Sequence, residues 1–178
     1  MRGILVFLLL FSNVFAQTLT SAQKKIAKQI YEIAITAPNC KGVTYEHTLI
    51  KIAMQESSLG VNLLGDYKKG QDITTASLGI FQFQVQTVRL LQKKYHKLLG
   101  WLGKKSDRYI AQTLLRSVDF NVVLAVLNIK RLSESKLTHG SYFRIISQWN
   151  GGIHNKLYYK RVQRHIRLVK KLIKEFKE

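Results

Sequence analysis

The chain contains 178 residues, of which 29 are Lys or Arg and 10 are Asp or Glu, so its formal net charge is +19. Apolar residues make up 46% of the composition, which excludes a disordered polyelectrolyte and predicts a globular protein. The length suits one domain with a sizeable core and leaves little room for a second.

Residues 1–16 have the pattern of a secretory signal peptide. An Arg precedes a run of nine apolar residues, and Val14 and Ala16 occupy the small-residue positions of a cleavage site. Nine apolar residues are well short of the ~20 that span a bilayer. We therefore expect an exported mature chain, residues 17–178, that is periplasmic or extracellular. Its surplus of cations predicts an anionic partner, such as a cell-wall polymer, a membrane surface or a nucleic acid.

The sequence has one cysteine, Cys40. A bacterial lipoprotein would need its cysteine directly after the apolar run, but Cys40 lies far downstream of that run, so we expect no lipid anchor. A single cysteine cannot form an internal disulfide. We expect Cys40 to be a buried thiol, and the alternative is a disulfide with another chain.

Helical periodicity recurs along the mature chain, and we expect a single all-α domain. Ser21 is expected to cap the first helix and Pro38 to end it, and a polar loop is expected at 61–78. The apolar stripes that predict the helices are Ile26, Ile30 and Ile33; Leu49, Ile52 and Ala53; Val88, Leu91, Tyr95 and Leu98; Val122, Ala125, Ile129 and Leu132; Phe143, Ile146 and Trp149; and Val162, Ile166, Val169, Ile173 and Phe176.

One segment departs from the helical pattern. The residues GIFQFQVQ, 79–86, alternate apolar and Gln side chains with the period of a strand. We expect a short strand or extended turn at 79–84 inside an otherwise helical fold.

Glu56 occupies a position where the helical pattern would place an apolar side chain. It continues the stripe of Leu49, Ile52 and Ala53, and it lies in the last turn before Gly60. Desolvation and the negative end of the helix dipole both disfavour the ionised carboxylate, so its pKa should be raised. An acid that stays protonated near neutral pH suits general acid catalysis of glycosidic cleavage. The alternative is a Glu that bends out to water or pairs with a lysine.

Four segments in register carry a resemblance to a known family. They are Glu56 and Ser57; Gly79, Ile80, Phe81 and Gln82, preceded by Ser77 and Leu78; Asn121, Val122 and Ala125; and Gln148, Trp149, Asn150, Gly151 and Gly152, followed by Tyr158 and Val162. In order and spacing, over about 110 residues from Leu49 to Val162, they resemble the catalytic domain of the soluble lytic transglycosylases (SLT domain), relatives of the goose-type lysozymes. The family patterns are Glu-Ser, Gly-Leu-Met-Gln, Asn-Ile-x-x-Gly, Ala-Tyr-Asn-Ala-Gly and Tyr-x-x-x-Val.

The resemblance implies a lysozyme-like helical fold that cleaves the bond between N-acetylmuramic acid and N-acetylglucosamine in peptidoglycan. Glu56 would be the sole catalytic acid and base, and Tyr158 would help to position its carboxylate. The resemblance also implies substrate contacts by Ser57, Phe81, Gln82, Asn150 and Tyr158. Three of these residues have a structural alternative: Ser57 could cap a helix end, Gln82 could be a solvated strand residue, and Asn150 could belong to an ordinary turn.

Three positions depart from the family pattern. Trp149 stands where the family has Tyr, Phe81 where it has Met, and Ala125 where it has Gly. Trp149 carries no phenolic hydroxyl, so any role that needs one would pass to Tyr158. Phe in place of Met changes how the floor of the cleft meets a sugar ring. The departures therefore bear on substrate fit more than on the catalytic acid.

Two other functions stay open at this point. A hydrolytic muramidase would need a second carboxylate to direct water, and Asp66 and Asp72 are the candidates in the loop after Glu56; both could equally be solvated loop charges. A non-catalytic basic protein that binds the cell wall or a membrane has only the charge in its support.

No metal or cofactor is expected. The five histidines have no metal-ligand spacing, and neither a phosphate-binding Gly-rich loop nor a Cys cluster occurs. The expected partners are peptidoglycan glycan strands, and a secretion, conjugation or wall-remodelling complex could recruit the enzyme; nucleic acid is not expected. The basic residues of the C-terminal helix, 156–174, could hold the protein near anionic surfaces.

Overall fold

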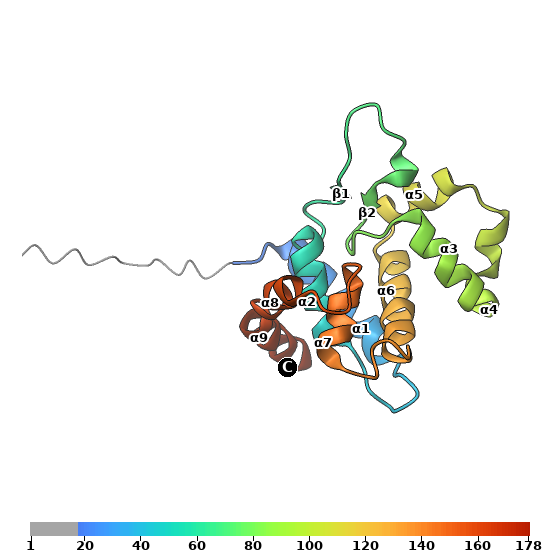
Figure 1. The fold of residues 1–178 in the computed structure, drawn as a ribbon. Coiled ribbons are helices and arrows are strands. Elements are labelled where there is room, and N and C mark those ends of the chain that lie inside the picture. Colours follow the sequence, from blue (N-terminus) through green and yellow to red (C-terminus); the bar gives the residue numbers. More distant parts are fainter. Residues whose placement is uncertain (1–17) are drawn as a thin grey trace, which may run out of the picture.

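The computed structural model describes residues 18–178, and the predicted signal peptide lies outside the described residues. The prediction of a single all-α domain is confirmed (Figure 1). The described part contains the helices α1 (Ser21–Ile35), α2 (Glu46–Ser57), α3 (Val85–Lys94), α4 (His96–Leu99), α5 (Asp107–Arg116), α6 (Val118–Ser133), α7 (Tyr142–Trp149), α8 (Lys156–Gln163) and α9 (Ile166–Lys177). Two 3-10 helices, η1 (Ile73–Thr75) and η2 (Gly100–Lys104), and the strands β1 (Leu64–Gly65) and β2 (Ser77–Leu78) complete it.

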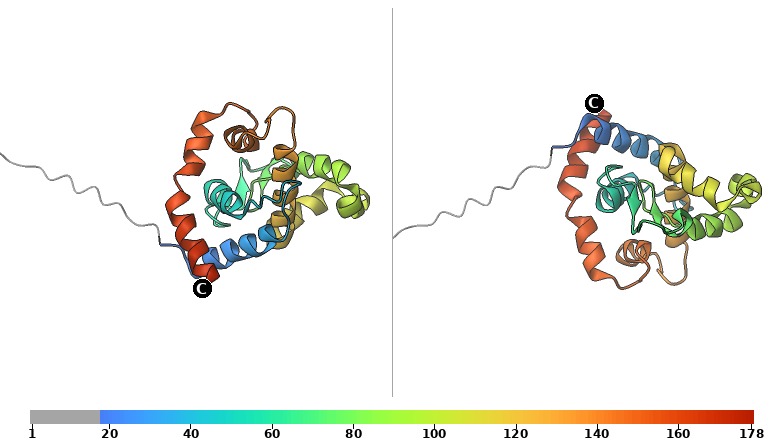
Figure 2. Two further views of the ribbon diagram at one scale, coloured as in Figure 1. Left: turned by 90° about the horizontal axis from the view of Figure 1, so that it is seen from below. Right: turned by 90° about the horizontal axis from the view of Figure 1, so that it is seen from above.

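Helix α2 lies in the middle of the domain. The views along the vertical direction of Figure 1 show it surrounded by α1, α6, α7, α8 and α9 (Figure 2). Eight of its twelve residues are buried, including Leu49, Ile52 and Ala53 of the predicted stripe. Because neighbours cover α2 on nearly all sides, a polar residue on it meets protein rather than water unless a cleft opens there.

The start of α1 differs by one residue from the prediction. Thr20, not Ser21, is the N-cap: its hydroxyl accepts a hydrogen bond from the Gln23 amide at 3.2 Å. The Gln23 side chain accepts one in return from the Thr20 amide at 2.9 Å. This capping box satisfies two backbone donors that Ser21 at the cap would leave to water.

Helix α5 was missing from the predicted elements. Ser106 caps it by accepting a hydrogen bond from the Tyr109 amide, and Ile110, Ala111 and Leu114 are buried on one side. Its apolar stripe covers a single turn and a half, which is too short to stand out against the surrounding Lys and Arg residues. Together, α3, α4 and α5 form the lobe on the right in Figure 1.

The predicted C-terminal helix is divided into α8 and α9, which meet at Arg164 and His165. Helix α9 follows α8 along the same side of the domain, and its end crosses α1, where the rings of Tyr31 and Phe176 lie 5.7 Å apart between centroids (Figure 2). Val162, Val169 and Ile173 of the predicted stripe are buried, but Ile166, at the start of α9, is 40% exposed. The buried stripe is therefore interrupted at the break, although the periodicity of the sequence continues through it.

The extended segment that we expected at 79–84 lies slightly earlier in the chain. Strands β1 and β2 pair antiparallel through Leu64 and Leu78. Residues 79–82 instead form a tight turn, closed by two hydrogen bonds between Leu78 and Phe83 of 2.8 and 2.9 Å. Ile80, Phe81, Phe83 and Val85 are buried, while Gln84 and Gln86 are exposed at the start of α3, so the alternation arises where the turn passes into the helix and not in a strand.

Cys40 is an exposed thiol, so the prediction that it is buried is wrong. It lies in the surface connection between α1 and α2. There the side-chain oxygen Oδ1 of Asn39 accepts hydrogen bonds from the amides of Lys41 and Val43, both at 2.9 Å, and so holds the turn that follows Asn39.

None of the single helices within residues 18–178 is long and apolar enough to cross a membrane. Taken together, α5 and α6 are long and apolar enough, but the two helices are bent by 106° relative to each other.

Candidate active site

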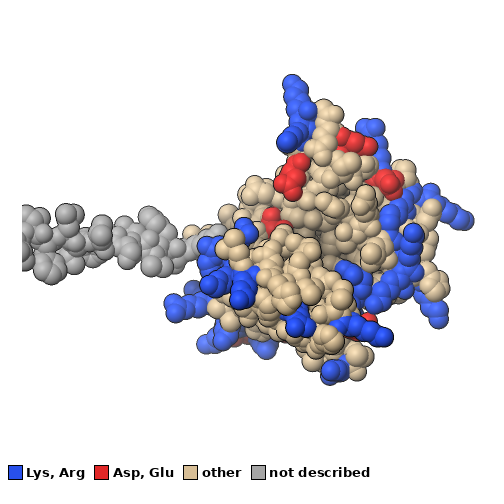
Figure 3. Space-filling model, in the orientation of Figure 1, with Lys and Arg blue, Asp and Glu red and all other residues tan. Residues whose placement is uncertain are grey.

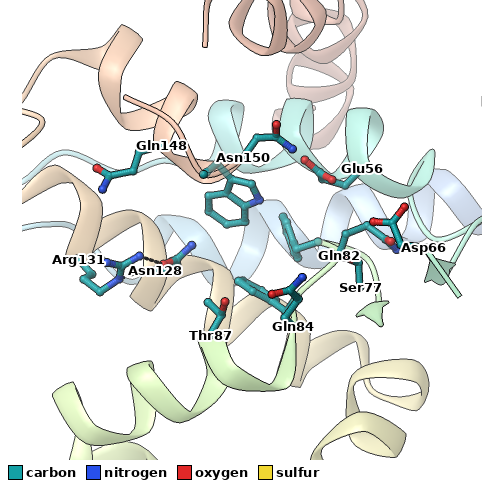
Figure 4. Close-up of a pocket in the computed structure, with 15 residues that line it drawn as sticks. Glu56, Asp66, Ser77, Gln82, Gln84, Thr87, Asn128, Arg131, Gln148 and Asn150 are labelled. Atoms are coloured by element: carbon teal, nitrogen blue, oxygen red, sulfur yellow. Dashed lines mark hydrogen bonds between the residues drawn. The ribbon is translucent and has the colours of Figure 1, made fainter. Parts of the chain in front are cut away.

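Glu56 lies at the edge of a cleft with a volume of about 650 Å³ (Figure 4). The end of α2 contributes Glu56, the turn after β2 contributes Phe81 and Gln82, and the end of α7 contributes Trp149 and Asn150. Segments far apart in the sequence therefore meet in one concave surface. The space-filling view shows Lys and Arg mainly along the flanks of the molecule, and few of them in the middle of this face (Figure 3).

Burial raises the pKa of the Glu56 carboxyl above its ordinary value. A hydrogen bond from Tyr158 and the positive charge of Arg161 act in the opposite direction, and the negative charge of Asp66 adds to the increase. Burial is the largest of these influences. The sign agrees with the sequence prediction, and a raised pKa keeps a larger fraction of the carboxyl protonated near neutral pH.

The Tyr158 hydroxyl donates a hydrogen bond to Oε1 of Glu56. Tyr158 is 2% exposed and is carried by α8, whose N-cap Asn155 accepts a hydrogen bond from the Tyr158 amide at 2.9 Å. Burial and the adjacent Glu56 raise the pKa of this phenol, so it remains a donor. Tyr158 thus orients the carboxylate, as the resemblance implied, but it does not line the cleft and is not a substrate contact.

The prediction that Ser57 contacts substrate is wrong. Ser57 is 1% exposed, and its hydroxyl donates to the Ile80 carbonyl at 2.7 Å. The same oxygen accepts a hydrogen bond from the Gly60 amide at 2.9 Å. Ser57 therefore ties the end of α2 to the turn at 79–82, which fixes the position of its neighbour Glu56 relative to the cleft floor.

Asn121 holds the other side of that turn from within α6. It is 1% exposed, its Oδ1 accepts from the Ile80 amide at 3.0 Å, and its Nδ2 donates to the carbonyls of Leu114 at 2.6 Å and Ser117 at 2.8 Å. Gly79 has φ +76°, and any Cβ there would collide with Asn121 Oδ1. The match of Gly79 and Asn121 to the family pattern thus reflects their role in holding the backbone of the turn, rather than a contact with substrate.

Gln82 lines the cleft with φ +52°, and its side chain packs over Gly65 of β1. Its Nε2 donates to the carbonyls of Asn62 at 3.0 Å and Gly79 at 2.9 Å. These bonds hold the amide in place and leave its oxygen without a hydrogen-bond donor among the described residues. A fixed amide oxygen at a cleft wall can accept a hydrogen bond from an acetamido N–H or a sugar hydroxyl.

Three aromatic rings meet at the cleft floor. Phe81 lies 6.2 Å from Phe83 and 5.9 Å from Trp149, and Phe83 lies 5.6 Å from Trp149, measured between ring centroids. Phe81 is 1% exposed, whereas Trp149 is only partly buried. Trp149 therefore presents the ring that a sugar could cover, and Phe81 mainly supports it.

Asn150 lies at the C-terminal end of α7 and is exposed in the cleft. Its Oδ1 accepts a hydrogen bond from Asn155 Nδ2 at 3.1 Å, which leaves its own amide N–H groups without an acceptor among the described residues. Gly151 follows with φ +88°, a conformation that lets the chain leave α7 and return to α8. Asn150 and Glu56 are neighbours on one side of the cleft in Figure 4.

The two candidate second carboxylates differ. Asp66 lines the same cleft as Glu56 and is drawn near it in Figure 4. Asp72 is exposed outside the cleft and accepts a hydrogen bond from the Thr74 amide at 3.0 Å as the N-cap of η1. That bond lowers the pKa of Asp72. Only Asp66 is therefore placed to act with Glu56.

The cleft also contains residues that the sequence reasoning missed. Helix α6 contributes Asn128 and Arg131, and Gln148 reaches the same end of the cleft from α7 (Figure 4). Asn128 and Arg131 are spaced i, i+3 and so lie on one helix face, but they belong neither to the apolar stripe that predicted this helix nor to the segment at 121–125 that carries the resemblance. No three His, Cys, Asp or Glu side chains of residues 18–178 come together as a metal site.

Comparisons of this chain with protein-family models, with curated proteins and with solved structures gave no match.

Proposed function

We propose that the protein is an exported lytic transglycosylase that cleaves the bond between N-acetylmuramic acid and N-acetylglucosamine in peptidoglycan. The observation that carries the proposal is Glu56: one partly buried carboxylate with a burial-raised pKa, oriented by Tyr158 at the edge of a cleft. The sequence resemblance in four segments supplies the substrate class. The cleft supports it with fixed amides and a partly exposed Trp149, which suit acetamido groups and the apolar faces of sugars.

In the proposed mechanism, protonated Glu56 first donates its proton to the leaving oxygen of N-acetylglucosamine while the bond to C1 of the muramic acid breaks. The acetamido group of the substrate stabilises the positive charge at C1. The ionised Glu56 then accepts the proton of the 6-hydroxyl, and O6 attacks C1. Glu56 ends protonated, no water is consumed, and a 1,6-anhydro ring forms.

An intramolecular nucleophile explains why one carboxylate can suffice. The 6-hydroxyl is part of the sugar that reacts, so no water has to be recruited and oriented. Effective molarities of ~10⁵ M or more are reached when a reacting group is held in this way. Tyr158 keeps Oε1 of Glu56 in a fixed place, which lets the same group serve both proton transfers.

A hydrolytic muramidase is the second candidate, and the position of Asp66 favours it. Asp66 lines the cleft near Glu56 and raises its pKa, as expected of two carboxylates that face a common substrate. In that mechanism Asp66 would direct water to C1 after Glu56 protonates the leaving oxygen.

Mass spectrometry of fragments released from purified sacculi distinguishes the two reactions. We expect 1,6-anhydro-muramic acid ends, which are lighter by one water than hydrolysed ends, and Asp66→Asn should leave this product and most of the rate intact. Reducing muramic acid ends, lost in Asp66→Asn but not in Asp72→Asn, would identify a muramidase. Absence of any glycan cleavage by the folded protein would favour a non-catalytic wall-binding role.

The surplus of positive charge gives the proposed enzyme a means of staying near anionic surfaces. In α9, Arg167, Lys170, Lys171 and Lys174 are exposed, while Val169 and Ile173 face the core. The proposed location is the periplasm or the outside of the cell, with peptidoglycan as the partner.

A further inference from the structure

Arg131 lies at the end of the cleft opposite Glu56 (Figure 4). It projects from α6, and its guanidinium is partly buried against the cleft wall. Trp149 lines the same cleft and stands in the chain between Gln148, at the Arg131 end, and Asn150, beside Glu56, so a glycan that crosses the cleft from Glu56 would pass over Trp149 toward Arg131. The proposed reaction does not use this charge.

The guanidinium is held in a fixed orientation. Its Nε and Nη2 both donate to Asn128 Oδ1, at 3.1 and 2.8 Å, one helical turn earlier. Nη1 donates no hydrogen bond to any of residues 18–178, so one edge of the planar fork is free. A fixed fork with free N–H groups is suited to bind a carboxylate through two hydrogen bonds.

No carboxylate of residues 18–178 neutralises this charge, since none forms an ion pair with Arg131. Glu134, the acidic residue three positions further along, pairs instead with Lys94 at 3.7 Å. A partly buried cation of this kind has lost part of its hydration and has no ion pair to replace it. An anionic group on a ligand would complete the site.

Gln148 supplies a second polar group at the same end of the cleft. Its Oε1 is buried and has no hydrogen-bond partner among the described residues. An unpaired buried acceptor costs free energy that a ligand N–H can recover. A fixed carboxylate-binding fork beside an N–H acceptor matches the chemistry of a peptide, which carries both carboxylates and amide N–H groups.

We infer that Arg131 and Gln148 form a subsite for the peptide arm of the glycan, in which the guanidinium binds a carboxylate and Gln148 Oε1 accepts a peptide N–H. This inference rests on the proposed function, because it assumes a peptidoglycan strand in the cleft. A muramic acid without its peptide also carries a carboxylate, on its lactyl ether. The experiment therefore has to separate these two sources.

Equilibrium binding to soluble glycan fragments tests the subsite without turnover, in a Glu56→Gln background. Three ligands of equal glycan length are compared: fragments with intact peptide arms, the same fragments after an amidase has removed the arms, and chito-oligosaccharides without any carboxylate. The variants are Arg131→Gln, which removes the charge, Arg131→Lys, which keeps the charge but not the fork, and Lys130→Gln as the neighbouring control. Circular dichroism confirms that each variant is folded.

We expect Arg131→Gln to weaken binding of the peptide-bearing fragments by about tenfold or more, the size typical of losing a charged hydrogen bond. Binding of chito-oligosaccharides should change less than about twofold, Arg131→Lys should fall between, and Lys130→Gln should match the parent. If Arg131→Gln weakened binding of the peptide-bearing and the amidase-treated fragments equally, the bound carboxylate would be that of the lactyl group. The proposed binding of the peptide arm would then be wrong.

Three further outcomes would overturn the subsite itself. Equal weakening of all three ligands would mean that Arg131 only shapes the cleft. Unchanged binding in Arg131→Gln, with glycan still bound, would remove the subsite and leave the proposed function intact. If the folded parent binds none of the three ligands, the proposed function fails first, and the subsite falls with it.

Discussion

Two of the ionisable side chains on helix α2, Glu56 and Lys51, have opposite environments. Glu56, near its end, accepts a hydrogen bond from Tyr158 of α8 at the edge of the cleft. Lys51, in its middle, is 4% exposed and donates to the Tyr142 hydroxyl at 2.7 Å and to Gln163 Oε1 at 3.2 Å. The same helix therefore forms a hydrogen bond with one tyrosine through the carboxylate of Glu56 and with another through the ammonium group of Lys51.

The two tyrosines respond in opposite directions. Burial and the negative Glu56 raise the pKa of Tyr158. Burial acts in the same direction on Tyr142, but hydrogen bonds that involve Lys51, Thr48 and Gln163 outweigh it, and the pKa of Tyr142 is lowered. The difference teaches that burial of an ionisable group does not identify an active site. Lys51 is enclosed by partners, whereas Glu56 has one side chain partner and an open cleft beside it.

Replacing Glu56 should produce the largest effect on activity. Glu56→Gln preserves shape and can still accept the Tyr158 hydrogen bond, but it cannot donate a proton to the leaving oxygen. Clearing of sacculi should fall by at least ~10²-fold, the size typical of lost acid catalysis. The matched control is Glu32→Gln, an exposed carboxylate on α1 that should retain full activity. A folded Glu56→Gln protein with the wild-type rate would rule out this residue as the catalytic acid.

Replacing Lys51 should affect stability and spare catalysis. Lys51→Ala removes a buried side chain from the centre of the domain and leaves the Tyr142 hydroxyl with Thr48 as its partner at 3.1 Å. The free energy of unfolding, measured with urea, should fall by about 2 kcal/mol or more. At temperatures where the variant is folded, the rate of clearing should stay within about twofold of the wild type. A loss comparable with that of Glu56→Gln would contradict the separation of the two sites.

Removal of the Tyr158 hydroxyl should have an intermediate effect on catalysis. Tyr158→Phe deletes a hydrogen bond that lowers the pKa of Glu56, so that pKa should rise further. The rate at neutral pH should drop about tenfold, because the carboxylate is less well oriented and, with a higher pKa, its acid form is a weaker proton donor in the first transfer. The pH–rate profile should shift toward higher pH. Tyr159→Phe, the adjacent tyrosine on α8, is the control, and a similar shift in it would attribute the effect to α8 packing.

The smallest expected effect is a pH dependence of stability that belongs to Glu56. Below the unfolded-state pKa of about 4.3, both states hold the proton and Glu56 contributes nothing. As pH rises toward the raised native pKa, the unfolded state releases its proton first, so the native state loses stability relative to it. The melting temperature of Glu56→Gln minus that of the wild type should therefore be near zero at pH 4 and become positive at neutral pH. A difference that does not change with pH would contradict a burial-raised pKa.

Much of the site was accessible to sequence reasoning because it depends on local spacing. Glu56 stands out since it interrupts the stripe of Leu49, Ile52 and Ala53, and the direction of its pKa shift follows from that position. The role of Ser57 was predicted wrongly, because a hydroxyl after a catalytic Glu offers no local sign of whether it faces a ligand or a backbone carbonyl. Its bond to Ile80 spans 23 residues of sequence.

Sequence alone determined the helical class, the compositional bias toward cations and the identity of the one carboxylate on a core-facing stripe, since periodicity and charge are properties of consecutive residues. Only the tertiary structure decided that Asp66 lies in the cleft and Asp72 does not, that α8 turns Tyr158 toward Glu56, and that Arg131 faces the same cleft without an anionic partner. These relations join segments about 10 to 100 residues apart in the chain. They depend on how the helices pack, and helix packing brings together side chains whose distance along the sequence carries no information about their distance in space.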